Sequence, residues 1–513
     1  MGYKFDFNVD KDLPKLAWIA SIGQKSRTIY VVHGSSVECR DDFMVEGVWD
    51  DEFEKGNFHR SENFFGSGIR IDDDKVYFSI TSSPIDRLLF CEYKGMHLFS
   101  NSLILLLATT GARLDVEHDY KRESLSLCVS RNQYSRKFTV IHPEISNFYQ
   151  VFHENIIFTK EQITFEYRYK KHGLASYSQC LKFINDILIK VRKNYECDKR
   201  RNAIAPFSML SEGYDSTAVS VLVRQIGVKS VFIANKMKTY ISRFKRDDEV
   251  AGAKRIAEKL RYDVLFLDNK RSNVSDDELY FLATTYPKHH SGAWSEVGLH
   301  LMAKYIEVNC SAAVVFSGHH GDSVWDANIP NKILNEIRVP GRPLGYCSEM
   351  RLKSGFINIP LPGILATDIK DISNISLSSE MEPWRLHNSY DRPIPRRIAE
   401  EAGVERHLFG TEKKFVATKY NLPINSNLRK LFLEYLREEH RIHPITIYLE
   451  YMLNLLSKLS QIGNPQKRKK QIADNSLSYR LGKNIDLYFL LSIWATSKLS
   501  EGMASVMSKR PMP

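Results

Sequence analysis

Residues 203 to about 330 alternate between strand-like and helix-like segments, and this alternation constrains the fold more than any other feature of the chain. Short apolar runs rich in Val, Ile and Phe are followed by longer segments with apolar residues at helical spacing. Strands that alternate with helices are typical of an α/β fold, in which a parallel sheet carries helices on both faces. The predicted strands are 203–210, 230–234, 264–267 and 312–316, and the predicted helices are 216–225, 247–260 and 296–308.

The residues on either side of this region follow different patterns. Residues 1–170 are mainly short runs rich in Val, Ile, Phe and Tyr, which predict a sheet-rich α+β domain. Residues 171–425 contain the alternating region, and helical spacing over 176–195 predicts a helix near its start. Residues 426–513 are predicted to form a helical C-terminal region. The elements predicted in the first part are strands over 27–33, 75–80, 87–93 and 97–99, one run over 155–169, a hairpin turn at Gly95 and a helix over 101–109.

The last third of the chain is predicted to be largely helical from residue 331 onward, with a Pro-rich interruption at 357–362. Four consecutive basic residues, 467–470, are predicted to lie in a solvated loop. The longest apolar stretches of the chain are 102–108 and 485–495. Both are much shorter than the roughly 20 residues that a membrane span needs, so they predict buried helices.

The composition predicts a cytoplasmic protein with a basic surface. Charged residues make up 26% of the chain and the net charge is +11. A basic surface attracts polyanions such as ATP, tRNA or glycan phosphates, and net charge alone does not choose among them. The seven cysteines are scattered and never spaced as Cys-x-x-Cys, which argues against a disulfide framework and a cysteine-based zinc site. The first residues lack a long apolar core, so no signal peptide is expected.

A polar loop, Ser211-Glu212-Gly213-Tyr214-Asp215-Ser216-Thr217, lies directly between a predicted strand and a predicted helix. Backbone N–H groups at a helix N-terminus bind anions, and a glycine lets the backbone approach a phosphate closely. The Ser and Thr hydroxyl groups are suitable donors to phosphate oxygens. Asp215 repels a phosphate, so it is predicted to be a ligand of the Mg²⁺ that accompanies ATP. A simple helix cap is the alternative interpretation.

This loop resembles the Ser-Gly-Gly-x-Asp-Ser loop of the ATP pyrophosphatase (PP-loop) superfamily, and it lacks the Gly-x-x-x-x-Gly-Lys-Ser/Thr pattern of kinase-type loops. The resemblance implies an adenine nucleotide alpha hydrolase-like fold, cleavage of ATP between its α and β phosphates, and transfer of AMP to an oxygen of the substrate. The sequence departs from the family at Glu212, where the family has Gly. The residues that the resemblance assigns to nucleotide binding are Ser211, Gly213, Asp215, Ser216 and Thr217.

A second polar loop, Ser317-Gly318-His319-His320-Gly321-Asp322-Ser323, follows the predicted strand 312–316. It resembles the Ser-Gly-x-Gly-x-Asp-Glu loop of asparagine synthetases. The resemblance implies that Ser317 and Gly318 contact the nucleotide and that Asp322 is the second metal carboxylate. Asp215 and Asp322 both follow strands of one predicted parallel sheet, and such sheets bind ligands at the carboxyl ends of their strands. We therefore expect the two carboxylates to converge on one Mg²⁺.

Two pairs of adjacent histidines lie in or near the predicted site. His319 occupies a position where relatives place a Glu or a Tyr near the reacting centre, and a histidine there is a candidate general base for an incoming amine. The alternative is that His319 and His320 contact only nucleotide or solvent. His289 and His290 lie near the place where relatives bind substrate. Because adjacent histidines have poor geometry for chelation, zinc binding is the minor interpretation.

Residues 379–414 resemble the end of the asparagine synthetase catalytic domain. That family has a Glu-x-Arg-x-Pro-Phe segment, then a helix rich in Lys and Arg, then a Lys after a basic loop. Cations there stabilise the charge that develops on the α-phosphate during adenylylation. The resemblance implies that Glu380, Arg392 and Lys413 are catalytic, with Glu382 and Lys414 as alternatives to the first and last. The other charged residues, Arg396, Arg397, Glu400 and Glu401, are expected to form an exposed, ion-paired helix face.

Residues 1–170 resemble the glutaminase domain of asparagine synthetases in their sheet-rich pattern and their position before the phosphate loop. That glutaminase uses a cysteine at position 2 as its nucleophile. Here position 2 is Gly2 and the first cysteine is Cys39, so glutamine hydrolysis is not expected. The domain is expected to be a degenerate glutaminase-like scaffold or docking surface, as in lasso-peptide cyclases and β-lactam synthetases. A homodimer or a complex with a partner protein would form through it.

Three hypotheses for function follow. The first is an asparagine synthase-like carbon–nitrogen ligase that uses ATP and Mg²⁺, adenylylates a carboxylate or carbonyl oxygen, and joins it to an amine without glutaminase activity. Its substrate would be a small molecule, a sugar or a peptide. The second is a tRNA- or nucleobase-modifying PP-loop enzyme related to deazaguanine synthases, which is disfavoured because their zinc-binding cysteine cluster is absent from the sequence. The third is a non-catalytic nucleotide-binding protein.

Overall fold

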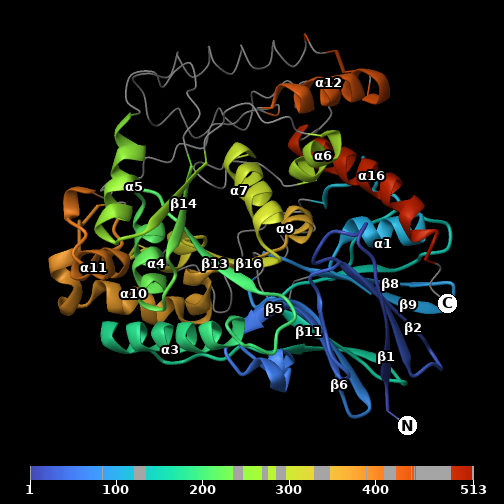
Figure 1. The fold of residues 1–513 in the computed structure, drawn as a ribbon, viewed down its shortest axis with the longest axis horizontal. Coiled ribbons are helices and arrows are strands. Elements are labelled where there is room, and N and C mark those ends of the chain that lie inside the picture. Colours follow the sequence, from blue (N-terminus) through green and yellow to red (C-terminus); the bar gives the residue numbers. More distant parts are fainter. Residues whose placement is uncertain are drawn as a thin grey trace.

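The chain folds into a two-sheet N-terminal region, a region built on a parallel sheet, and helices near the C-terminus (Figure 1). The structure is a computed structural model. It describes residues 2–120 except Pro84, 135–234, 247–267, 275–284, 296–328, 347–408 except Ser389, 423–445 with gaps, and 487–510. The predictions made for His289, His290, Lys413, Lys414 and 467–470 lie outside the described residues.

Two six-stranded sheets form the N-terminal region and pack face to face. The first contains, in order, β1 (Lys4–Val9), β3 (Thr28–His33), β2 (Trp18–Gly23), β9 (Met96–Ser100), β8 (Leu88–Tyr93) and β10 (Phe148–Val151). The second contains β12 (Ile163–Tyr167), β11 (Glu154–Phe158), β7 (Lys75–Ile80), β6 (Phe64–Asp72), β5 (Phe43–Trp49) and β4 (Glu38–Cys39). Between the sheets, Phe78 of β7 stacks on Phe99 of β9 with their ring centroids 3.8 Å apart. The expected sheet-rich N-terminal region is confirmed.

The third sheet is parallel throughout. It contains, in order, β15 (Asp263–Leu267), β14 (Ser230–Ala234), β13 (Ile204–Met209), β16 (Ala312–Ser317) and β17 (Phe356–Pro360). From β13 the chain first builds outward to one edge, and it then returns to build the other half from β16. The winding therefore reverses between β13 and β16, and ligands of open α/β sheets bind outside the carboxyl ends of strands at such a point.

Helices cover both faces of the parallel sheet. Along β16, Val314 and Phe316 belong to the core that includes α4 (Tyr214–Gln225), whereas Val315 belongs to the core that includes α7 (Glu296–Asn309). Successive side chains of a strand point to opposite faces, so this alternation places the two helices on opposite sides. The predicted α/β fold with a parallel sheet is confirmed. The remaining helices near this sheet are α5 (Asp247–Lys259), α8 (Gly321–Val324), α9 (Ser348–Ser354), α10 (Ile369–Leu377) and α11 (Pro393–Glu401).

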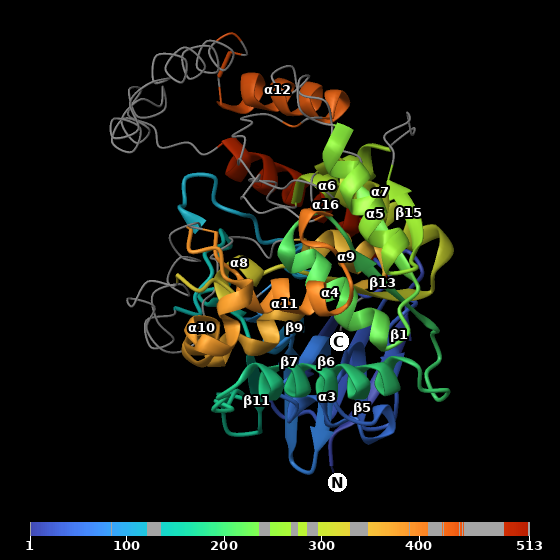
Figure 2. The same cartoon turned by 90° about the vertical axis from the view of Figure 1, so that its left-hand side faces the viewer.

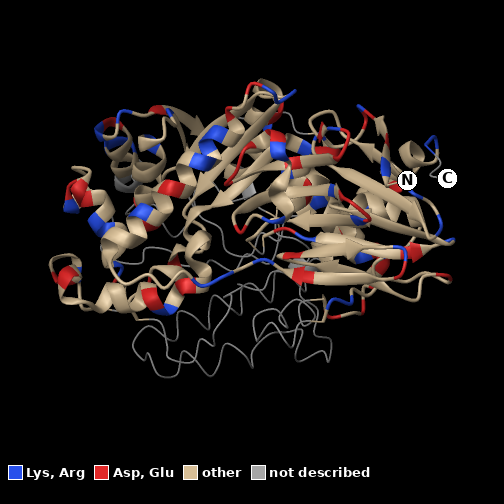
Figure 3. Ribbon diagram, turned by 90° about the horizontal axis from the view of Figure 1, so that it is seen from below, with Lys and Arg blue, Asp and Glu red and all other residues tan. Residues whose placement is uncertain are grey.

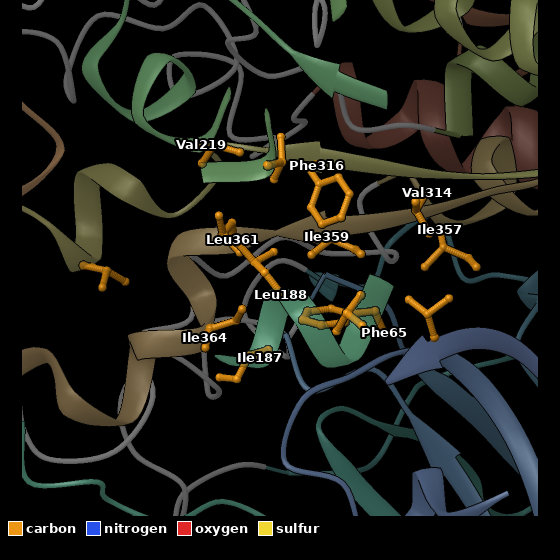
Figure 4. Packing of buried hydrophobic residues seen from close by; sticks show 14 of the residues in the cluster. Phe65, Ile187, Leu188, Val219, Val314, Phe316, Ile357, Ile359, Leu361 and Ile364 are labelled. Atoms are coloured by element: carbon orange, nitrogen blue, oxygen red, sulfur yellow. The ribbon is translucent and has the colours of Figure 1, made fainter. Parts of the chain in front are cut away.

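The N-terminal sheets and the parallel sheet share one apolar core (Figure 4). Phe65 of β6, Leu188 of α3 (Tyr177–Tyr195) and Ile357 of β17 all belong to it. The helix α3 lies alongside the N-terminal strands in both views of the ribbon (Figures 1 and 2). Because this core is continuous across the two regions, neither region buries its apolar surface alone.

A buried ion-pair network also joins the two regions. Arg351 of α9 donates to both carboxylate oxygens of Glu46 in β5 at 2.8 and 2.9 Å, and to Asp86 at 2.7 Å. The three side chains are at most 4% exposed. Losing one partner from such a network is costly because the remaining charges stay buried without compensation.

The last described helix, α16 (Leu487–Met507), crosses back to the N-terminal region (Figure 1). It packs against α1 (Leu103–Thr110) and α6 (Asp276–Thr284). The prediction of a buried helix over 102–108 is confirmed, and the described part of 485–495 is helical as well. Among the described residues, no helix is long and apolar enough to cross a membrane. A separate helix, α12 (Ser426–His440), lies beside α6.

Two predictions about strands are wrong. The Pro-rich segment 357–362 was predicted to be an interruption between helices. Its first residues belong instead to β17, the buried edge strand of the parallel sheet. Proline is tolerated there because Pro360 ends an edge strand and breaks no central ladder. The run 155–169 is two antiparallel strands, β11 and β12, and not one. The turn between them is closed by a hydrogen bond from the Thr159 N–H to the Gln162 carbonyl at 3.0 Å.

Acidic and basic residues are interspersed along the ribbon (Figure 3). Pairs such as Arg192 with Glu196 and Lys353 with Glu307 neutralise each other locally. An interspersed surface of this kind is usual for a solvated protein.

His172, in the connection between β12 and α3, is held by two carboxylates from different parts of the chain. Its Nδ1 lies 2.8 Å from Oδ2 of the buried Asp368, and its Nε2 lies 3.1 Å from Oε2 of Glu62. The hydrogen bond with Asp368 raises the pKa of His172, and Glu62 adds to this while burial opposes it. Burial raises the pKa of Asp368, but the hydrogen bonds with His172 lower this pKa by more, so it is below the usual range.

These shifts predict a pH window in which His172 stabilises the fold. The folded protein holds the His172 proton more tightly than the unfolded chain does, so the stabilisation is complete below about pH 6.5 and is lost as the pH rises through the raised pKa. The contribution of Asp368 is present above about pH 3.9 and is lost at lower pH. We expect His172→Gln to lower the urea midpoint more at pH 5.5 than at pH 9. Equal losses at both pH values would contradict this.

Candidate active site

The first polar loop connects β13 to α4 at the carboxyl end of the strand. Gly213 is the N-cap residue of α4, which begins at Tyr214, two residues before the predicted start. Asp215 is therefore in the first helical turn, where the helix dipole favours an acidic side chain. The first N–H groups of a helix have no carbonyl one turn earlier to bond to, so a turn of this kind is suited to bind an anion.

Three hydroxyl groups hold the loop in a tight turn. Oγ of Ser211 lies 2.7 Å from Oγ of Ser216, and the Gly213 N–H donates to the Ser211 hydroxyl at 3.2 Å. The Thr217 hydroxyl donates to the Ser211 carbonyl at 3.3 Å. The structure thus brings the four predicted phosphate-contacting residues of this loop together in one turn.

The second polar loop follows β16, the strand next to β13. Ser317 ends β16 and is fully buried, and its hydroxyl donates to Asn358 of β17 at 3.3 Å. Gly318 follows the strand, His319 and His320 form a turn, and His320 is the N-cap of the short helix α8. Asp322 lies in α8 and is exposed.

Two glycines allow the loops to touch. A methyl group on Gly318 would lie 2.7 Å from the backbone nitrogen of Ser216. A methyl group on Gly321 would lie 2.6 Å from Oδ1 of Asp215, which is closer than carbon and oxygen approach without bonding. The Asp215 carboxylate therefore rests against the residue that precedes Asp322. This close approach is possible only because neither glycine carries a side chain.

Arg392 forms an ion pair with Asp215. Its Nη1 lies 2.5 Å from Oδ2 of Asp215, although the two residues are 177 positions apart. Burial lowers the pKa of Arg392, but Asp215, then Tyr390 and then Asp322 raise it by more than burial lowers it. Asp215 bonds to this guanidinium directly, and the charge of Asp322 in α8 also acts on it, so we group Asp215, Asp322 and Arg392 as one charged cluster.

The guanidinium of Arg392 belongs to a stack of four side chains. It lies over the ring of Tyr390 at 4.5 Å, and Tyr390 stacks on Tyr214 with ring centroids 5.1 Å apart. Arg396 lies over the other ring, 5.1 Å from the centroid of Tyr214, and donates to its hydroxyl at 2.6 Å. Stacked cations and rings of this kind fix the guanidinium planes. The stack connects α4 with α11, which lie side by side in Figure 2.

Asp391 lies between Tyr390 and Arg392 in the chain and fixes the backbone there. Its buried carboxylate accepts from Arg385 Nε at 3.0 Å and from the Leu386 N–H at 2.9 Å. Its carbonyl accepts from the N–H of Ala327, three residues beyond α8. The segment that carries Arg392 is thereby attached to the end of the second loop.

The Glu212 side chain is turned toward α5. A methyl group placed on Gly252 of α5 would clash with the Glu212 carboxylate. The glycine at position 252 therefore leaves room for the one residue of the first loop that departs from the family pattern.

The histidine pair of the second loop contacts the N-terminal region. The ring of His320 is buried beside that of His319, with centroids 4.3 Å apart. His320 Nε2 lies 3.2 Å from Oγ of Ser83, which follows β7. A residue of the N-terminal region thus supports the loop that carries Asp322, a contact that the sequence did not predict.

The other predicted site residues lie elsewhere. Glu380 is 43% exposed and pairs with Arg397 on the outer side of α11, so the structure does not bring it to the Asp215 cluster. Arg397 pairs with Glu401, and Glu400 pairs with Arg406 beyond the helix, but the side chains of Arg397 and Glu400 are only 17% and 20% exposed, so the expected exposed face is present in part. The prediction for Arg396 is wrong because this residue is fully buried. It lies four residues after Arg392, so both face α4.

Several residues of the site were missed by sequence reasoning. Tyr390 and Asp391 lie beside Arg392 in the sequence, yet no motif marked them. Arg392 and Arg396 are four residues apart, a spacing that places two side chains on the same side of a helix. This spacing could have predicted a pair of cations on one side of α11. The burial of that face depends on packing against Tyr214, which helical spacing alone does not reveal.

The oxygen donors of the cluster fit a magnesium ion that is bound together with phosphates. Mg²⁺ in nucleotide sites takes one or two protein carboxylates and completes its shell with water and phosphate oxygens. Asp215 and Asp322 supply two carboxylates beside the turn at the start of α4. In the part of the chain that the structure describes, no group of three or more His, Cys, Asp or Glu residues is arranged to hold a metal ion alone.

A comparison with protein families matches residues 205–327 of this chain to the model for asparagine synthase. The matched segment begins in β13 and ends three residues after α8, so it contains both loops with Asp215 and Asp322. Arg392 and the N-terminal sheets lie outside it. A comparison with curated proteins gave no match. This segment is therefore asparagine synthase-like, as the two loops predicted.

Proposed function

We propose that this protein is an ATP-dependent, AMP-forming ligase that adenylylates a carboxylate or carbonyl oxygen of its substrate and joins the activated group to an amine. The observation that carries the proposal is the cluster of Asp215, Asp322 and Arg392 at the switch point of the parallel sheet. The asparagine synthase-like match over both loops supports an ATP-dependent amidation reaction.

In this proposal the first loop holds the phosphates of ATP. The N–H groups at the start of α4 and the hydroxyl groups of Ser211, Ser216 and Thr217 donate to phosphate oxygens. Ser317 and Gly318 lie next to this turn and complete the nucleotide site. Mg²⁺ on Asp215 and Asp322 would neutralise phosphate charge and orient the leaving pyrophosphate.

The reaction has two steps. A substrate oxygen attacks the α-phosphorus, the bond to the β-phosphate oxygen breaks, and pyrophosphate leaves. The amine nitrogen then attacks the activated carbon, AMP leaves with its oxygen, and the amine proton passes to a base. Arg392 stabilises the charge on the phosphates, and His319 is the proposed base. Glu380 and Lys413 stay predictions, because the first lies in a surface ion pair and the second outside the described residues.

The proposal does not include glutaminase activity. The family's glutaminase needs a reactive cysteine, and a reactive thiol has a lowered pKa. Burial raises the pKa of Cys39, the first cysteine of this chain, to about 12. Its thiol therefore stays protonated at neutral pH, and we propose that the amine comes from ammonia or from the substrate. The N-terminal sheets then act as a scaffold that supports the second loop through Ser83.

The test of this proposal is the identity of the nucleotide product. The protein is incubated with Mg²⁺, ATP labelled at the α-phosphate, ammonia and a panel of amino acids, uronic acids and short peptides with free carboxylates. We expect labelled AMP and an equal amount of pyrophosphate with the cognate member of the panel. Formation of ADP and phosphate would refute the proposal. ATP binding without pyrophosphate release across the panel would favour a non-catalytic nucleotide-binding protein.

A further inference from the structure

We propose that Arg392 is a built-in counter-ion of Asp215 that leaves the carboxylate when a divalent cation binds, and that its guanidinium then turns to the phosphates. The inference rests on the proposed function for its second half only. Its starting observation is the ion pair between Arg392 Nη1 and Asp215 Oδ2, in which the Arg392 side chain is only 3% exposed.

The charges of the cluster favour such an exchange. Asp215, Asp322 and Arg392 together carry a formal net charge of −1: Asp215 pairs with the guanidinium directly, and the negative charge of Asp322 acts on it from α8. A divalent cation on both carboxylates would leave Arg392 beside a second positive charge. Two cations near one carboxylate repel each other strongly at a partly buried site. Arg392 and the cation therefore compete for Asp215.

The stacked rings allow Arg392 to change partner without losing its position. The central carbon of its guanidinium lies 4.5 Å from the centroid of the Tyr390 ring, and this contact is separate from the ion pair that Nη1 makes. The Nε of Arg392 is buried and has no hydrogen-bond partner among the described residues. This N–H group is therefore available to a further acceptor. A guanidinium has five N–H donors in a fixed plane and pairs well with phosphate oxygens. Rotation of the side chain would exchange one acceptor for another.

Arg396 fixes the far end of the stack and is not the exchanging group. Its Nη2 donates to the Tyr214 hydroxyl, and its side chain is fully buried between α4 and α11. Tyr214 precedes Asp215, so the same stack positions both the carboxylate and its counter-ion. We therefore assign Arg396 the role of a positioning residue.

The experiment measures metal binding without any nucleotide. Mn²⁺ replaces Mg²⁺ because its free form is counted directly by electron paramagnetic resonance. We expect Arg392→Met to bind Mn²⁺ at least about tenfold more tightly than the unchanged protein, a gain of about 1.4 kcal/mol. Arg392→Gln, a second neutral variant, should give the same result if the first does not fold. The matched control is Arg192→Met, which removes an exposed Arg–Glu pair on α3 and should leave Mn²⁺ affinity unchanged.

A second background tests whether Asp215 is the shared group. With Asp215→Asn present, Arg392→Met should no longer tighten Mn²⁺ binding, since the carboxylate for which the two cations compete is gone. Unchanged or weaker Mn²⁺ binding by both neutral Arg392 variants would overturn the inference. Tightening that persists with Asp215→Asn would overturn it as well.

Mn²⁺ binding tests the counter-ion role, and the identity of the nucleotide product tests the proposed function. Tighter Mn²⁺ binding together with ADP as the product would reject the ligase and retain the counter-ion. AMP and pyrophosphate as products, together with unchanged Mn²⁺ binding in the Arg392 variants, would retain the ligase and reject the counter-ion.

Discussion

Replacing Asp215 with Ala is expected to abolish ATP-dependent turnover. The carboxylate lies at the first turn of α4 and against Gly321, the residue before Asp322, so its loss removes one of the two carboxylates that we propose as metal ligands. A catalytic metal ion supplies several kcal/mol of transition-state stabilisation. Since each 1.4 kcal/mol is a factor of ten, we expect pyrophosphate release to fall on the order of 10³-fold or more. The measurement is the rate of AMP formation with the cognate substrate.

The Asp215 variant also removes the partner of Arg392, so its effect on folding needs a control. Asp215→Asn keeps an oxygen that accepts from Arg392 but removes the charge that the metal ion requires. We expect this variant to stay folded at the assay temperature, because the amide oxygen still accepts from Arg392, and to be as inactive as Asp215→Ala. Asp198→Ala, which changes an exposed aspartate, should retain full activity. Turnover by a folded Asp215→Asn variant within tenfold of normal would contradict the proposed role.

Replacing Arg351 with Met is expected to destabilise the whole described fold. Arg351 is the only cation shown to bond Glu46 and Asp86 within the described residues, and all three side chains are buried. Breaking a buried pair by removing one partner costs about 3–5 kcal/mol, because the remaining charge is left in a site of low polarity. The measurement is the urea midpoint of unfolding, followed by circular dichroism. Because the network joins β5 to α9, we expect one transition that shifts as a whole.

The matched control for this prediction lies on the same helix. Lys353→Met removes a partly exposed pair with Glu307, and pairs of this kind contribute about 0–1 kcal/mol. A rescue variant that adds Glu46→Gln and Asp86→Asn to Arg351→Met removes the uncompensated charges and should recover part of the lost stability. A loss below about 1 kcal/mol for Arg351→Met alone would show that the network is weak.

Local patterns predicted most of the parallel-sheet region. The strand over 230–234 and the starts of α5 and α7 were predicted at their observed residues, because a run of apolar residues or a helical repeat extends over each element. The helix α4 begins two residues early, since Tyr214 and Asp215 join its first turn. The strand β17 was not recognised because its prolines suggested an interruption, and only pairing with β16 makes it a strand.

The order of the amino acids alone was enough to predict the two loops to which we assign the chemistry. Each loop combines hydroxyl groups, a glycine and an aspartate directly after a buried strand, and these residue types suit phosphate and metal binding wherever the strands meet. The division into residues 1–170, 171–425 and 426–513 stays a prediction, and the shared core around Phe65 and Ile357 shows that the first two parts are closely packed.

Only the tertiary structure decided which charges meet. Helical spacing predicted an exposed Arg396, whereas packing of α11 against Tyr214 buries it, and Asp215 pairs with an arginine 177 residues away. Glu380 matched the family pattern but lies in a surface pair with Arg397. The physical reason is the range of the forces involved. Propensity and periodicity act over a few neighbouring residues, while burial and the choice of a counter-ion depend on groups that only the folded chain brings together.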